Sequence, residues 1–446
     1  MQDKTVEVEE LFKKLVRNRD IELDVVAYGT IVKGLCKIGN TVMALRLLRI
    51  MEKGSCKPDT VVYSTIIDCL CKDRMVDHAM KLLSEMNEKG ISIDIVTCTS
   101  LIHGLCSFGK WKEATTMFTE MLNAGIFPNV HTFNVLVDAL SKEGKAKEAE
   151  EILELMIERG VDPDVFTYSS LMDGYCLRGQ VDDVVRVFHT MVERGVQPNV
   201  LSHSILINGY CKVKKMDEAM HLLREMPQKG FKPNVVTFST VVQGLFRIGK
   251  CAAAEGLFEE MQVSGLIPST VTFGIMLDGL SKNGHIAKAL SLFRTMENNG
   301  LDINVVKYNI LIDALCKDKK IDHAKDLFNE LSSKGLHPNV VTYNIMIQGF
   351  CAIGRLDEAK QFFVEMEQNC CFPDVGTYNI MIRGFLVGQK YSEALLLHEE
   401  MVGKGFSADA STVSLIVNLM STKGQDPTLR GIIERFMPKN GWEYKR

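Results

Sequence analysis

The sequence lacks a strong charge of either sign and any long apolar run. Its 52 Lys and Arg against 56 Asp and Glu give a net charge of −4 over 446 residues, too near neutral for a polybasic arm or a disordered acidic tail. No uncharged apolar stretch approaches the roughly 18 to 20 residues that a membrane-spanning helix needs, which excludes an integral membrane protein. Only 11 Pro accompany 46% hydrophobic residues, so we expect a chain that is folded throughout.

The start of the chain also lacks targeting features. Residues 1–7 have neither the apolar core of a secretory signal nor the Arg-rich, acidic-poor composition of an organelle transit peptide. We therefore expect either that the protein stays where it is made or that a targeting segment has been removed.

What the chain does have is internal repetition. Val-Val-Lys-Tyr-Asn-Ile-Leu-Ile begins at Val305, and Val-Val-Thr-Tyr-Asn-Ile-Met-Ile begins 35 residues later at Val340. The period holds without a gap from Val25 to Asp409 and defines eleven repeats, whose positions are numbered below as places one to thirty-five. The repeats start at residues 25, 60, 95, 130, 165, 200, 235, 270, 305, 340 and 375. Residues 1–24 are predicted to be the second helix of an incomplete repeat, which leaves room for more repeats upstream, and residues 410–446 a partial twelfth repeat with capping helices.

Each repeat contains two apolar patterns with helical spacing. The first helix is expected to begin near places three to five and to bury places seven, eight, eleven and twelve, which are Leu311, Ile312, Leu315 and Cys316 in the ninth repeat. The second is expected from about place sixteen, with Ala at place twenty and Met at place twenty-seven buried. Gly at place thirty-one and Pro at place thirty-four mark its end. Because a helical hairpin cannot bury its apolar sides alone, stacking of the repeats predicts an all-α solenoid.

The repeat resembles the pentatricopeptide repeat. The resemblance rests on the Val-Val-Thr-Tyr-Asn opening, the Gly-Leu-Cys-Lys centre, the Asp-Glu-Ala of the second helix and the Gly-x-x-Pro-Asn/Asp close, and it covers 385 of 446 residues. It is specifically to the pure P-type array. This resemblance implies a right-handed α-solenoid superhelix that binds single-stranded RNA, one base per repeat, as a monomer without cofactor, membrane or catalysis.

A finer resemblance concerns the biological setting. The frequent Cys at place twelve is similar to plant restorer-of-fertility-like members of the family, which act in mitochondria. It implies a mitochondrial protein, with the chloroplast as the alternative, that alters RNA processing, stability or translation by occlusion or by recruiting a nuclease or another RNA-processing protein.

A protein-binding scaffold of the tetratricopeptide type is the alternative from a different class. That repeat is 34 residues long and carries a Trp, Leu-Gly and Tyr pattern in its first helix. This chain has a 35-residue period and only two Trp, Trp111 and Trp442. A scaffold would also have no evident reason to restrict places five and thirty-five to Gly, Ser, Thr, Asn and Asp, so this restriction favours RNA.

Cysteine and histidine spacing gives no catalytic or metal site. No CxxC pair occurs among the 13 cysteines, and no Pro-Cys-x-x-Cys follows the deaminase-like string at His398, which is therefore interpreted as a second-helix residue. Seven cysteines share place twelve and are predicted to be small buried hydrophobes. These are Cys36, Cys71, Cys106, Cys176, Cys211, Cys316 and Cys351.

The resemblance assigns roles to four places. Place two holds a base between successive repeats, places five and thirty-five recognise its edge, and a basic residue at place thirteen approaches the phosphate. Gly376, at place two of the last repeat, should hold a base poorly. The place-two residues that can sandwich a base are Val26, Val61, Val96, His131, Phe166, Leu201, Val236, Val271, Val306 and Val341. The place-thirteen cations are Lys37, Lys72, Lys142, Lys212, Arg247, Lys282 and Lys317.

Donor and acceptor logic predicts the bases. Asp offers only acceptors and suits the ring N–H of uracil or guanine, whereas Asn can also donate to the ring acceptor of adenine or cytosine. The family adds that Ser or Thr at place five favours purines and Asn favours pyrimidines. In order, Gly29 with Asp59 is left open, Ser64 with Asp94 predicts G, Thr99 with Asn129 A, Asn134 with Asp164 U, Ser169 with Asn199 A, Ser204 with Asn234 A, Ser239 with Ser269 a purine, Gly274 with Asn304 a weak A, Asn309 with Asn339 C or U, Asn344 with Asp374 U, and Asn379 with Asp409 U.

These assignments predict the site 5′-N-G-A-U-A-A-R-A-Y-U-U-3′. Both Asn134 and Asp164 are expected to lie in the groove and outside the core. Seven cations along a single strand would give a slope of log affinity against log salt no steeper than about −5. The net charge is too small for nonspecific coating of nucleic acid, which favours recognition through the bases.

Overall fold

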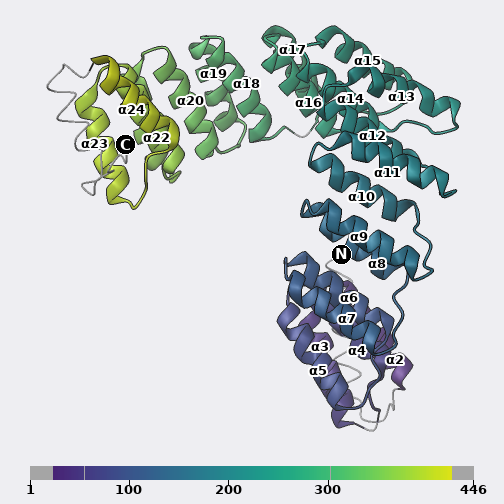
Figure 1. Cartoon of the computed structure of the whole chain (residues 1–446). Helices are drawn as coiled ribbons and strands as arrows, with labels where there is room; N and C mark the ends of the chain where they lie inside the picture. Colours follow the sequence, from purple (N-terminus) through teal and green to yellow (C-terminus); the bar gives the residue numbers. More distant parts are fainter. Residues whose placement is uncertain (1–23, 55, 302, 424–446) are drawn as a thin grey trace, which may run out of the picture. The chain divides into compact units, whose positions relative to one another are not determined.

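The computed structural model describes residues 24–54, 56–301 and 303–423, and all regular secondary structure in these ranges is α-helix (Figure 1). The chain divides into two compact units, Met1–Pro233 and Asn234–Arg446. The predicted all-α solenoid of helical repeats is confirmed. The incomplete helix expected in residues 1–24 and the cap expected after residue 423 lie almost wholly outside the described residues. No described helix is long and apolar enough to cross a bilayer.

First and second helices alternate along each unit. In Met1–Pro233 the first helices are α2 (Val25–Lys37), α4 (Thr60–Lys72), α6 (Ile95–Ser107), α8 (Val130–Lys142), α10 (Val165–Leu177) and α12 (Val200–Lys212). The second helices there are α3 (Thr41–Lys53), α5 (Val76–Glu88), α7 (Trp111–Asn123), α9 (Ala146–Glu158), α11 (Val181–Glu193) and α13 (Met216–Gln228).

The unit Asn234–Arg446 has the same alternation. Its first helices are α14 (Val235–Arg247), α16 (Thr270–Lys282), α18 (Val305–Lys317), α20 (Val340–Ala352), α22 (Val375–Val387) and α24 (Ala410–Lys423). Its second helices are α15 (Cys251–Val263), α17 (Ile286–Asn298), α19 (Ile321–Ser333), α21 (Leu356–Gln368) and α23 (Tyr391–Gly403).

The first helices begin at place one, so the expectation of a start at places three to five was wrong. In α10, the side chain of Asp164 accepts a hydrogen bond from the backbone N–H of Thr167, and the Thr167 side chain bonds back to the Asp164 backbone. This reciprocal capping box satisfies two polar groups at the helix start and fixes the boundary. The periodicity of apolar residues could not locate it, because the first turn is partly exposed.

The core of each repeat lies between its two helices, as predicted. Leu311, Ile312, Leu315 and Cys316 are all buried in α18. Place twenty, which is Ala in ten of the eleven repeats, is fully or almost fully buried in every repeat. This small side chain lets the two helices approach closely. The methionines of place twenty-seven are also buried. Gly90, at place thirty-one, has φ +69°, a left-handed conformation that favours glycine after a helix end.

Within each unit, successive repeats pack through both layers. The first helix of one repeat contacts the first helix of the next, as α4 contacts α6 and α18 contacts α20. At several repeat boundaries the second helix contacts the next first helix through aromatic rings. Phe293 meets Tyr308 edge to face with 5.0 Å between ring centroids, and Phe328 meets Tyr343 at 5.3 Å. Such pairs add to the apolar surface that is buried between repeats. One face of the first helices stays uncovered by these contacts.

Candidate nucleic-acid interface

In each unit, place two forms a row of exposed side chains on the uncovered face of the first helices. Val26 is 74% exposed and even the large ring of Phe166 is 46% exposed. All ten residues predicted to sandwich a base are exposed in this way. Single exposed apolar residues are ordinary, but a row repeated at one place is the kind of surface that a partner covers.

Every place-thirty-five residue caps the helix that follows it. Asp59 accepts from the N–H of Val62 in α4, Asn129 from Thr132 in α8 and Ser269 from Thr272 in α16. Ser, Asp and Asn are the preferred N-cap residues for this reason. The restriction of place thirty-five to these residues therefore has a structural cause, and it does not by itself distinguish an RNA-binding protein from a protein scaffold.

Place five lies at the contact between successive first helices. Most of its side chains are buried, and several hydrogen-bond to the hydroxyl at place three of the next repeat. Thr99 Oγ1 lies 2.8 Å from Thr132 Oγ1, and Ser239 Oγ lies 2.9 Å from Thr272 Oγ1. Sequence reasoning missed place three, whose recurring Thr is a visible signal.

The pair Asn134 and Asp164 shows how these places meet. The Nδ2 of Asn134 donates to Oδ1 of Asp164 at 3.2 Å, and the Thr167 hydroxyl lies 2.5 Å from the Asn134 Oδ1. Asn134 is only 6% exposed, so the expectation that it lies outside the core was wrong, because the next repeat covers it. Asp164 is exposed as expected.

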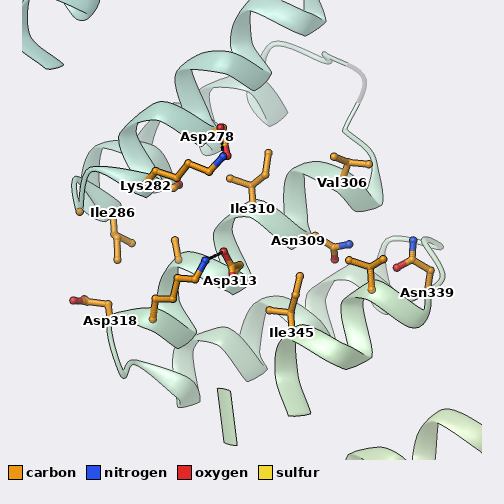
Figure 2. Close-up of a pocket in the computed structure, with 15 residues that line it drawn as sticks. Asp278, Lys282, Ile286, Val306, Asn309, Ile310, Asp313, Asp318, Asn339 and Ile345 are labelled. Atoms are coloured by element: carbon orange, nitrogen blue, oxygen red, sulfur yellow. Dashed lines mark hydrogen bonds and ion pairs between the residues drawn. The ribbon is translucent and has the colours of Figure 1, made fainter. Parts of the chain in front are cut away.

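A cavity between α16, α18 and α20 is lined both by residues predicted to sandwich a base and by residues predicted to recognise its edge. It has a volume of about 630 Å³, and its walls include Val306 and Val341 of place two together with Asn309 and Asn339. Figure 2 shows Asn309 on α18 between Val306 and Ile345, with Asn339 beyond them. The cavity therefore combines apolar walls with two amide side chains.

Some place-five atoms in the described structure have no partner. The Oδ1 atoms of Asn309 and Asn344 and the Oγ of Ser169 are buried and make no hydrogen bond with described residues. A buried polar atom without a partner costs roughly 1 to 3 kcal/mol. Of these three residues, Asn309 lines the cavity described above.

Comparison with known proteins gives the family. The model of the PPR repeat family matches residues 23–72, 58–107, 93–142, 128–177, 170–212, 205–247, 240–282, 268–306, 303–352, 338–387 and 373–422. The chain belongs to the PPR repeat family. No curated protein matches it.

A solved structure from maize has the same fold as this PPR chain. The pentatricopeptide repeat protein PPR10 from maize is similar over 97% of this chain and 73% of its own, with 24% identity and a TM-score of 0.59. PPR10 in complex with an 18-nt psaJ RNA element matches over 96% of this chain and 81% of its own, with 22% identity and a TM-score of 0.45. Nuclear proteinaceous RNase P 2 from A. thaliana covers 41% of both chains, with 17% identity and a TM-score of 0.36.

The seven place-thirteen cations of this PPR chain are all exposed, but several of them already have a partner. Four form ion pairs with an Asp four residues earlier, at 2.5 to 2.8 Å. Lys212 instead donates to the backbone carbonyl of Cys176 at 3.1 Å. Lys37 and Arg247 have no Asp at the corresponding place.

The eleventh PPR repeat differs from the others. Arg383 donates to both carboxylate oxygens of Asp409, at 3.1 and 2.9 Å. Partial burial raises the pKa of Asp409, but hydrogen bonds from Thr412 and Arg383 outweigh it and lower the pKa. Asn379 is 1% exposed, and its Oδ1 accepts from the Asp409 backbone N–H and the Thr412 hydroxyl. Both predicted base-reading residues are therefore already occupied.

The place-twelve cysteines mostly belong to the core, as predicted. Burial raises the pKa of Cys71, Cys106 and Cys316 to about 12, which keeps these thiols protonated at neutral pH. Cys36 and Cys351 are only partly buried, so the prediction was wrong for those two. His398 lies in the second helix α23 as predicted, and burial lowers its pKa.

Proposed function

We propose that this chain binds single-stranded RNA along the exposed face of its first helices, with one base per repeat. The observation that carries the proposal is the environment of Asn309. Asn309 lines a cavity whose walls include Val306 and Val341, and its Oδ1 has no hydrogen-bond partner among described residues. An unpaired base offers apolar faces for the two valines and a polar edge for the amide.

Helix capping explains how place thirty-five distinguishes bases. The Oδ1 of Asp164 accepts from the Thr167 N–H, so its other oxygen remains to accept from the ring N–H of uracil. The Oδ1 of Asn339 likewise accepts from the Thr342 N–H, so its Nδ2 remains to donate to a ring nitrogen of cytosine or adenine. Asp and Asn cap equally well but present opposite groups to the base.

The site we propose is 5′-N-G-A-U-A-A-R-A-Y-U-U-3′, with its last nucleotide the most weakly selected because Arg383 bonds to both carboxylate oxygens of Asp409. The protein would act without catalysis in an organelle, the mitochondrion first, by occluding RNA or recruiting a processing protein. A protein-binding scaffold is the rival. The cavity that joins the amides of Asn309 and Asn339 with the exposed place-two residues Val306 and Val341 favours RNA, because a folded or extended peptide does not offer flat apolar faces at one per repeat.

Selection of bound RNA from a random single-stranded pool tests this function. We expect enrichment of a motif with U aligned to the Asn134 and Asp164 pair and A aligned to Ser169 with Asn199. The matching duplex should compete poorly, since its base edges are already paired. A pool without a motif, or equal affinity for single strand and duplex, would overturn the proposal.

A further inference from the structure

Four lysines on the RNA-facing surface are held by a carboxylate of their own helix. Each pair joins place thirteen to place nine, four residues earlier, and the distances range from 2.5 to 2.8 Å. The pairs are Lys72 with Asp68, Lys142 with Asp138, Lys282 with Asp278, and Lys317 with Asp313.

These ion pairs lie at the proposed RNA site. Figure 2 shows Asp278 with Lys282, and Asp313, around the cavity that also contains Val306 and Asn309. The Lys317 side chain is 70% exposed and its partner Asp313 is 37% exposed. The lysine is therefore open to an incoming phosphate, but its ammonium is already paired with a carboxylate.

The carboxylate of Asp68 has a hydrogen-bond partner in the next repeat as well as its ion pair with Lys72. Its Oδ2 pairs with Lys72, and its Oδ1 accepts a hydrogen bond from Ser100 of the next repeat at 3.2 Å. The carboxylate is thereby fixed at the boundary between α4 and α6. It cannot turn away from the lysine without losing this second bond.

We propose that the place-nine aspartates restrain sequence-independent RNA binding by competing with phosphate for the place-thirteen lysines. This inference rests on the proposed function. A phosphate must replace an existing ion pair, so the net electrostatic gain per contact is small, and contacts with the bases decide which RNA is retained. The alternative role is stabilisation of the helix by pairs four residues apart. That role changes stability but not the salt dependence of binding.

The proposal predicts a value for the slope of log affinity against log salt concentration. If only the three cations without a place-nine Asp release counterions fully, the wild-type slope is about −2, less steep than the limit of about −5 for seven free cations. Freeing one lysine should steepen the slope by about 0.7. It should also raise affinity roughly two- to five-fold, the range that corresponds to one exposed ion pair.

The chain supplies a matched control. Asp173 occupies place nine of α10, one repeat after Asp138, but Leu177 stands at its place thirteen. Asp138→Asn and Asp173→Asn make the same change of charge on neighbouring helices, and only the first frees a lysine. The double variant Asp138→Asn with Lys142→Met removes that lysine as well.

Fluorescence anisotropy at several salt concentrations, with the proposed site and an oligocytidine of equal length, tests the inference. We expect Asp138→Asn to strengthen binding of both RNAs by similar factors and to steepen both slopes. Asp173→Asn should change affinity less than about two-fold and leave the slopes unchanged. The double variant should lose the gain.

Two results would overturn the inference while leaving RNA binding intact. One is an Asp138→Asn slope equal to that of the wild type, and the other is an equal gain from Asp173→Asn. Failure of the proposed function is distinguishable, because then the wild-type protein would not prefer the proposed site to oligocytidine at any salt concentration.

Discussion

Asn134 Nδ2 donates to Asp164 Oδ1 at 3.2 Å, across the boundary between two repeats. The same relationship joins Asn344 to Asp374, at 3.5 Å. In each case the acceptor atom also caps the next first helix. One carboxylate oxygen thus holds the repeats together while the other remains for a ligand, and the roles of this side chain can be separated by substitution.

Removing the cap without changing the fold elsewhere should measure its structural role. Asp164→Ala loses the bonds from the Thr167 N–H and the Asn134 Nδ2, and loss of the cap alone should lower the free energy of unfolding by about 1 kcal/mol. Asp164→Asn retains a capping oxygen and should be almost neutral. Urea unfolding followed by circular dichroism compares the two. Equal losses in both variants would mean that charge, not capping, is what stabilises α10.

The strongest base contact is expected in the fourth repeat. A cavity of about 550 Å³ is lined by His131 and Phe166 of place two and also by Asn134 and Asp164. Base stacking on an aromatic ring contributes about 1 to 3 kcal/mol, so Phe166→Ala should weaken binding of the proposed site by that amount. Phe166 is 46% exposed, so folding should change little.

Val306→Ala is the control for that variant, because it shortens an exposed place-two residue that has no ring. It should weaken binding less than Phe166→Ala in the same titration. Equal losses of affinity in the two variants would show that the ring of Phe166 contributes no more to binding than an aliphatic place-two side chain.

Removal of the hydrogen bonds from Arg383 to Asp409 should create a preference between U and C at the last nucleotide of the site. The wild-type protein should hardly distinguish U from C there, since Arg383 bonds to both Asp409 oxygens. Arg383→Met leaves the carboxylate free and should introduce a preference for U. Titration with two RNAs that differ only at that nucleotide measures it. A clear preference for U already present in the wild type would contradict this role of Arg383.

An ion pair between second helices should contribute to acid sensitivity. Hydrogen bonds from Arg294 lower the pKa of Glu330 to about 2, from 4.5. Because the pKa is lowered on folding, the stabilisation is present above about pH 4.5 and is lost as the pH falls toward 2. Glu330→Gln should therefore reduce stability at pH 7 and flatten its fall with acid. Thermal unfolding from pH 7 to 3 checks this, and an unchanged pH profile would contradict it.

Sequence periodicity predicted the helices and their core because burial repeats with the helix. Leu311 and Ile312 are buried for that reason, as the pattern indicated. The double role of Asp164 could not be predicted, because the residue types that cap a helix are the same types that recognise a base. The burial of Asn134 depends on a neighbouring repeat.

Contacts between residues far apart in the sequence could not be predicted from the periodicity either. Arg383 and Asp409 lie 26 residues apart and meet only in the folded chain. In contrast, the pair of Asp313 and Lys317 was within reach of the sequence, because opposite charges four residues apart share one helix face.

The central claim is that place thirty-five recognises a base with the atom that capping leaves free. Asp164→Asn tests it most directly, because the variant keeps the cap and changes only that atom from acceptor to donor. The measurement is affinity for two RNAs that carry U or C at the third nucleotide of the site beginning G-A-U. We expect the wild type to prefer U and the variant to prefer C, each by about 1 to 3 kcal/mol. The same order of preference in both folded proteins would contradict the account.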